Sequence, residues 1–141
     1  GRSSTCGCHD RAMSFDVFLQ GFRNGASANG NGAEVRKVLD PFIVESGDTW
    51  ANVATADGSA EAYGIDDLNT GLMFTHLNGR EIWNVVFDAA HAGGFVVMPT
   101  GCPVGVLNEV TIEHLPTSLA EDAGVAVVTT GADLLQLAAN G

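Results

Sequence analysis

The chain has 141 residues, of which 45% are apolar and 16% charged, a balance typical of soluble globular proteins. Its 17 Asp and Glu residues outnumber its 6 Lys and Arg residues, so the formal net charge is −11. Such a surface repels phosphate backbones and anionic lipid, which argues against nucleic acid or a membrane as partner. No run approaches the roughly 18 apolar residues of a membrane-spanning helix, so the sequence predicts a soluble protein.

The negative charge is concentrated after Arg80. No Lys or Arg follows that residue, and two explanations stay open: an acidic surface that binds a basic protein partner, or solubility alone. The carboxylates of this half are Glu81, Asp88, Glu109, Glu113, Glu121, Asp122 and Asp133.

The three cysteines, Cys6, Cys8 and Cys102, are an odd number, which does not fit a secreted disulfide framework. No segment resembles a signal peptide, so we predict a cytoplasmic protein. Residues 1–12 contain no large apolar side chain, whereas Met13 opens a patterned segment. We therefore predict a non-native or disordered leader over 1–12 and a single globular domain over 13–141.

The first part of this domain is predicted as strand, loop and helix. Alternating apolar residues predict a central strand over Met13–Phe22. The Gly-, Asn- and Ser-rich segment 24–32 predicts a mobile loop. Asn31 and Glu34 have the spacing of a helix N-terminus, and Pro41 ends the helix that follows.

A meander of three strands follows. The dipeptide Asp57-Gly58 predicts a tight hairpin, because it supplies two residues with positive φ between the strands Thr49–Ala56 and Ser59–Tyr63. A third strand is predicted over Gly71–Leu77.

The second part is predicted as a main helix and a crossover. Asn78 and Glu81 have capping spacing before a broad apolar stripe, which Gly93-Gly94 ends. The continuous apolar runs Phe95–Pro99 and Val125–Thr129 predict two buried strands, parallel because a helix joins them. The remaining segments are predicted as a loop over Thr100–Gly105, a helix or strand over Asn108–Leu115, a helical turn over Pro116–Asp122 and a last helix over Ala132–Ala139.

These elements together predict an α+β fold in two layers. The sheet would be mixed and mostly antiparallel, with about five or six strands forming a meander and one strand-helix-strand crossover, and with about three or four helices. A free edge of the meander or an exposed apolar patch would let two copies pair, so a homodimer is one predicted assembly.

Cys102 is the candidate nucleophile of a small thiol-dependent enzyme. It stands between two glycines in the loop after a buried strand, and His91 or His114 could act as its base. The alternative is that Cys102 is a small apolar side chain of the core, which is the more common role of a free cysteine. Because the sequence contains no complete catalytic motif, a non-catalytic role is favoured over an enzyme.

Trp50, Tyr63 and Phe74 are candidate ligand-binding residues, which would line a small-molecule pocket between the meander and the main helix. Core packing is the alternative for the aromatic residues. The adjacent carboxylates Asp66-Asp67 and Glu121-Asp122 fit solvated turns or helix surfaces. Cys6, Cys8 and His9 lack the second pair of ligands of a zinc site, so neither a metal nor a cofactor is predicted.

Both ends of the domain resemble a loose group of small, uncharacterised bacterial proteins. The similar segments are MSFDVFLQ at Met13–Gln20, FRNG at Phe22–Gly25 and TGADLL at Thr130–Leu135. The resemblance implies an immunity or accessory protein and brings no catalytic residues. The sequence therefore favours a non-catalytic protein that binds a basic protein partner.

Overall fold

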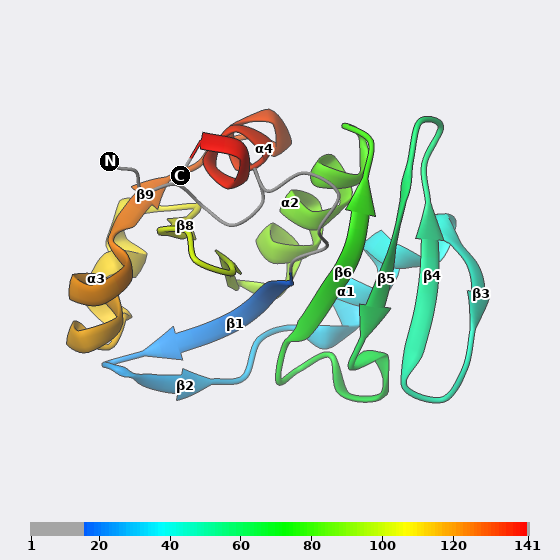
Figure 1. Ribbon diagram of the computed structural model, residues 1–141. Helices are drawn as coiled ribbons and strands as arrows, with labels where there is room; N and C mark the ends of the chain where they lie inside the picture. The colour runs from blue at the N-terminus through cyan, green and yellow to red at the C-terminus, as the bar shows by residue number, and fades with distance from the viewer. Residues whose placement is uncertain (1–15, 141) are drawn as a thin grey trace.

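The computed structural model of the protein describes residues 16–140, so the predicted leader and residues 13–15 of the predicted first strand lie outside the described part. A nine-stranded sheet organises the chain in the order β3-β4-β5-β6-β1-β7-β8-β9, with β2 paired to β1 (Figure 1). The strands are β1 (Val17–Arg23), β2 (Ala26–Ala28), β3 (Ile43–Ser46), β4 (Trp50–Ala54), β5 (Ser59–Tyr63), β6 (Leu72–Asn78), β7 (Val96–Pro99), β8 (Val104–Val106) and β9 (Val125–Val127).

The helices confirm the predicted α+β class. None of those within residues 16–140 is long and apolar enough to cross a bilayer. They are the α-helices α1 (Gly32–Leu39), α2 (Ile82–Gly93), α3 (Thr117–Ala123) and α4 (Gly131–Asn140), and the 3-10 helices η2 (Asp40–Phe42), η3 (Ile65–Asp67) and η4 (Glu109–His114).

Strand β1 lies in the middle of the sheet, as its alternating sequence predicts. It pairs antiparallel with β6 on one side and with β7 on the other. Val17 and Leu19 are buried in the main core, whereas Phe18 between them points to the opposite face and is 42% exposed. The two faces of the sheet therefore have different surroundings along this one strand.

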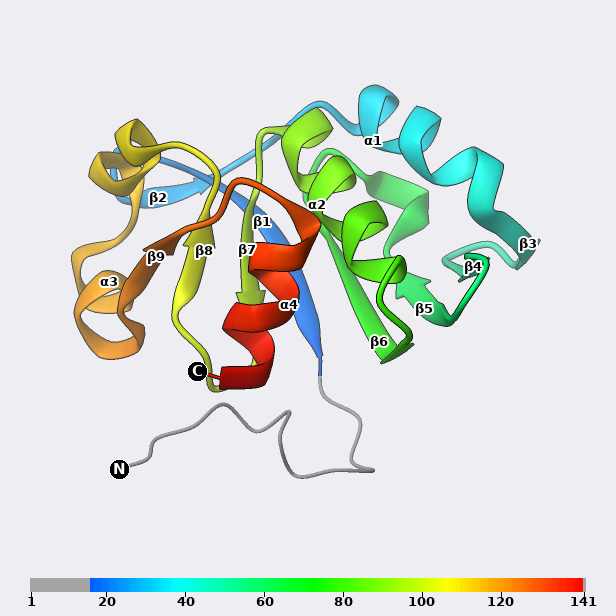
Figure 2. The same cartoon turned by 90° about the horizontal axis from the view of Figure 1, so that it is seen from above.

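The main core lies on the face that α1, α2 and α4 cover. The predicted apolar stripe of α2 is buried there, with Ile82 and Val86 fully enclosed beside Phe74 of the sheet and Leu134 of α4. Gly94 ends α2 in the left-handed conformation, with φ of 74°, as the predicted helix end requires. These contacts make α2 the central helix of the layer (Figure 2).

A second, smaller core lies on the other face of the sheet and corrects the prediction of two layers. Val96, Val104 and Val106 of β7 and β8 point into it, and Leu115 and Leu119 of the η4–α3 segment cover them. On the opposite side of β8, a Cβ on Gly105 would meet Leu134 and Leu137 of α4. The sheet is therefore covered on both faces at this end.

The sheet has more strands than the five or six predicted. The strands without a prediction are β2, β3 and β8, of 3, 4 and 3 residues. Strand β8 falls partly within the predicted loop over Thr100–Gly105 and corrects the crossover: β9 pairs in parallel with β8, and β7 pairs antiparallel with β8. The strand-helix-strand unit is therefore present, but it begins one strand later than predicted.

The segment 24–32 is not the mobile loop that its composition predicts. Asn24 and Gly25, with φ of 51° and 83°, form the tight turn between β1 and β2, in which Arg23 pairs with Ala26. Further along, the Gly30 amide donates to Asn69 O at 2.7 Å and the Asn31 amide to Gly93 O at 3.0 Å. Backbone pairing therefore holds the segment against the rest of the protein.

The predicted hairpin at Asp57-Gly58 is confirmed, but its physical basis differs from the prediction. Neither residue has a positive φ. The Asp57 carboxylate instead accepts the backbone amides of Arg80 at 2.9 Å and of Glu81 at 3.2 Å, at the start of α2. The cap of α2 therefore comes from this turn, and not from Asn78, which ends β6.

Substitution of Gly30 tests whether the segment 24–32 is held against the rest of the protein. A Cβ at this position would overlap the Gly93 carbonyl oxygen and the Phe95 ring. We expect Gly30→Ala to lower the free energy of unfolding by about 1–3 kcal/mol, as overpacking typically does, in urea denaturation. Asn29→Ala at the exposed neighbour is the control and should change stability little. Equal stability of the two variants would show that the segment moves freely.

Candidate functional site

Half of the outer face of the sheet has no helical cover among the described residues. The η4–α3 segment covers this face over β7, β8 and β9 and over the Phe22 end of β1. Helix α1 lies behind β4, β5 and β6 in Figure 1, so these three strands turn their other face to the viewer. We call the outer surface of β4, β5, β6 and β1 the open face.

A row of large apolar side chains crosses the open face from strand to strand and ends on the neighbouring strand β7, where Met98 packs against the second core. Successive neighbours in it are cross-strand partners, so their side chains lie on the same face. Tyr63 and Phe18 are 39% and 42% exposed, and the other three are half-buried. We call this set the apolar row; in spatial order it is Trp50, Tyr63, Met73, Phe18 and Met98.

A hollow of about 370 Å³ lies beside the apolar row, toward the β3 edge of the sheet. Glu61, two residues before Tyr63 on the same face of β5, is one of the residues that line it. We call it the polar hollow; its other lining residues are Val44, Asn52, Val53, Ala54, Ser59, Ala60, His76 and Asn78.

Two neighbours hold the Glu61 carboxylate. The Tyr63 hydroxyl donates to Glu61 Oε1 at 2.6 Å, and His76 Nδ1 lies 3.4 Å from the same oxygen. This hydrogen bond to Glu61 raises the pKa of Tyr63, because it stabilises the protonated phenol. Within residues 16–140 no hydrogen bond reaches Glu61 Oε2, so that oxygen is available to a ligand.

His76 reaches Glu61 through an irregularity in β6. The register between β5 and β6 shifts between the pairs Ser59–Asn78 and Glu61–Thr75, and His76 adopts a φ of 55°. This left-handed conformation is uncommon for a residue other than glycine. Such bulges redirect side chains and are frequent beside functional sites. No sequence signal marks this one, because the pairing partner determines it.

The structure separates the three predicted ligand-binding residues. Trp50 and Tyr63 are cross-strand partners on the open face, whereas Phe74 is fully buried on the core face, paired with Ala62. Phe74 itself fills the space between the meander and α2. The predicted pocket is therefore not formed there, and the surface that two of its three residues share faces outward.

The structure also separates Cys102 from the two histidines that were predicted as its base. Cys102 is 6% exposed and its sulfur is in a disulfide, so it is not a thiolate. It follows the last residue of β7, whereas His91 precedes β7 on α2. The His114 ring accepts the Asn24 amide at 3.2 Å, beside the end of β1 that pairs with the start of β7. Both histidines therefore lie at the opposite end of β7, about 13 Å of strand from Cys102.

The predicted cytoplasmic location stays a prediction.

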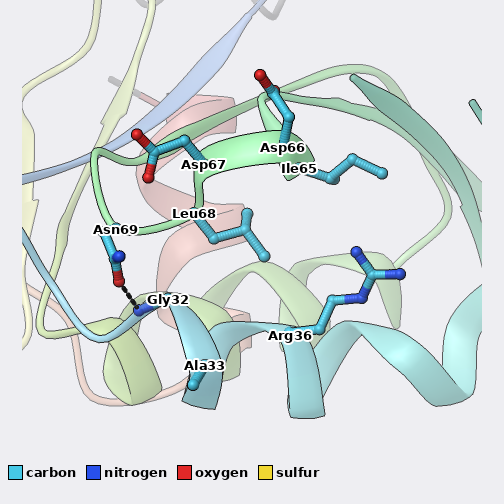
Figure 3. A pocket seen from close by; sticks show the side chains of 8 residues that line it. All are labelled: Gly32, Ala33, Arg36, Ile65, Asp66, Asp67, Leu68 and Asn69. Atoms are coloured by element: carbon cyan, nitrogen blue, oxygen red, sulfur yellow. Dashed lines mark hydrogen bonds between the residues drawn. The ribbon is translucent and has the colours of Figure 1, made fainter. Parts of the chain in front are cut away.

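A second hollow, of about 230 Å³, lies between α1 and η3. Asn69 Oδ1 accepts the Gly32 amide at 2.8 Å across it, so the N-terminus of α1 already has a cap (Figure 3). The side chains of Asp66 and Asp67 point away from α1, as expected for a solvated turn. Arg36 is paired with Asp40 at 2.8 Å. The Gly32 amide, Asn69 and Arg36 thus have partners within the protein.

Among the described residues, no group of three or more His, Cys, Asp and Glu side chains comes together as metal ligands would.

Within residues 16–140, the two end strands of the sheet, β3 and β9, each have one edge without a partner strand. The free edge on which a homodimer depends is therefore present, and the dimer itself stays a prediction.

Comparisons of the chain with protein-family models, with curated proteins and with solved structures found no match. The resemblance to small bacterial proteins at the two ends of the domain thus stays a prediction.

The carboxylate that caps α2 makes a pH-dependent contribution to stability. The Arg80 amide, and also the Glu81 amide and the Thr55 hydroxyl, lower the pKa of Asp57 below its ordinary value of 3.8. The stabilisation is therefore complete above the pKa of the unfolded chain and is lost as the pH falls through the lower folded value.

The variant Asp57→Asn keeps the shape of the side chain and removes its charge. We expect a lower free energy of unfolding at neutral pH and a smaller loss of stability on acidification than in the unmodified protein, both measured by urea denaturation. Glu121→Gln, on the exposed surface of α3, is the matched control. An acid dependence identical in Asp57→Asn and the unmodified protein would contradict the role of Asp57.

Proposed function

We propose that this protein is a non-catalytic binding protein of the immunity or accessory type, which uses its open face to bind a basic protein partner. The observation that supports this most is the apolar row. Trp, Tyr, Phe and Met are the residue types enriched at protein interfaces, and here they form one continuous strip across five strands.

The exposure and continuity of the apolar row distinguish it from the isolated apolar side chains that are common on protein surfaces. Single exposed apolar side chains are common on soluble proteins, whereas contiguous ones mark interaction sites. Phe18 and Tyr63 are both more than one-third exposed and flank Met73 in the row. A protein that covered them would remove large aromatic surfaces from water, which is the usual source of hot-spot binding energy.

The charge of the protein favours a basic partner. All the carboxylate side chains except Asp10 lie within residues 16–140, where the cations are Arg23, Arg36, Lys37 and Arg80. Two of these four are already paired on α1, Arg36 with Asp40 and Lys37 with Glu34. The resulting negative potential accelerates and orients association with a cationic protein.

The alternative of a thiol-dependent enzyme has less support. It requires an exposed thiolate beside a base, and Cys102 is buried in a disulfide at the far end of β7 from both His91 and His114. The alternative of a small-molecule-binding domain loses the enclosed pocket on which it depended, because Phe74 occupies that space.

Affinity capture from a lysate of the native organism, with the full chain as bait, tests the proposal. We expect a basic protein in stoichiometric amount, with binding weakened by salt. Phe18→Ser should weaken binding by about 2 kcal/mol, the loss typical of an aromatic hot spot, in calorimetry with the purified partner.

Val110→Ser is the matched control, because Val110 is 59% exposed on η4, outside the open face. This variant should bind as the unmodified protein does. The proposal fails if no basic protein is captured, or if Phe18→Ser and Val110→Ser bind the captured protein equally well.

A further inference from the structure

We infer that the polar hollow receives a cationic side chain, an arginine or lysine of the partner, with the Glu61 carboxylate as its counter-ion. This inference rests on the proposed function and adds the chemistry of the partner residue and the place where it binds. It depends on the lining of the hollow, on the state of Glu61 and on the position of the hollow beside the apolar row.

The lining of the hollow favours a cation. Glu61 brings a carboxylate, and the amide oxygens of Asn52 and Asn78 and the Ser59 hydroxyl can accept hydrogen bonds, whereas no Lys or Arg lines it. A second carboxylate lies nearby, since Asn52 Nδ2 donates to Glu45 Oε1 at 3.4 Å. An anion would meet two carboxylates here, with no Lys or Arg in the lining to compensate them.

Glu61 is held in place before a ligand arrives. The Tyr63 hydroxyl and His76 Nδ1 both approach Oε1, at 2.6 and 3.4 Å, which fixes the carboxylate and leaves Oε2 for a donor from outside. The bulge in β6 places His76 there, with a φ of 55°. A fixed acceptor lowers the entropy that binding costs.

The volume and the lining of the hollow fit a long side chain. Its volume of about 370 Å³ is within the range of ligand pockets. Val44 and Ala54 supply apolar wall for the methylene stem of Arg or Lys, whose charged end would reach Glu61. Because Tyr63 belongs to the apolar row and touches Glu61, a protein seated on the row can place such a side chain in the hollow.

A titration followed by amide NMR shifts of the full chain tests the inference without the partner. The probe is N-acetyl-arginine amide, and the uncharged control is N-acetyl-citrulline amide. We expect saturable shifts at Glu61, His76 and neighbouring residues with the arginine probe alone. Glu61→Gln should weaken this binding by about tenfold, the value of a hydrogen bond to a charged group.

Two further variants make the result specific. Tyr63→Phe keeps the ring and removes the hydroxyl that holds Glu61. This variant should therefore weaken binding of the arginine probe by a smaller factor than Glu61→Gln does. Glu121→Gln removes an exposed carboxylate on α3 and should leave binding unchanged. Shifts of equal size with the citrulline probe, or equal affinity of Glu61→Gln and the unmodified protein, would overturn the inference.

The partner, once captured, separates this inference from the proposed function. If Phe18→Ser weakens the complex and Glu61→Gln does not, the open face binds the partner and the inference about the hollow is wrong. If the arginine probe saturates the hollow but no basic protein is captured, the cation site is supported and the proposed function fails.

Discussion

The structure depends on the pairing of β1 with two strands that follow it far along the chain. Phe18 lies between Met73 of β6 and Met98 of β7, which are 55 and 80 residues later (73 − 18 and 98 − 18). The meander and the β7–β9 part of the sheet share no other strand. Because β1 also contributes side chains to both faces, it fixes the position of the main core and of the apolar row together.

The elements that the sequence predicted well are those whose signal is local. The helix at Asn31 and the end of α2 at Gly94 depend on residues within a few positions of each other, whereas the hairpin around Asp57-Gly58 is also held by the Arg80 and Glu81 amides. The strands β2, β3 and β8 are too short for a periodic signal and exist because a neighbouring strand pairs with them. The turn at Asn24-Gly25 was an available signal, since this dipeptide favours two-residue hairpins.

The candidate site could be predicted only in part. The sequence identified Trp50 and Tyr63 as aromatic residues of the meander, but the face on which each lies depends on register, and Phe74 lies on the other one. The contact of His76 with Glu61 depends on a bulge between two strands, which neither strand encodes alone. The acidic surface predicted after Arg80 belongs to the C-terminal half, whereas the open face belongs mainly to strands before it.

The unequal cover of the sheet has a consequence for how the native protein fluctuates. Around β7 and β8, apolar side chains are enclosed on both faces, whereas the strands β3, β4 and β5 have helical cover on one face and end at a free edge. Regions with fewer buried contacts open more readily by local unfolding. Backbone amides of the meander should therefore exchange with deuterium earlier than those of β1 and β7. A partner that covered the open face would slow this exchange, so binding and local order are coupled in this half of the molecule.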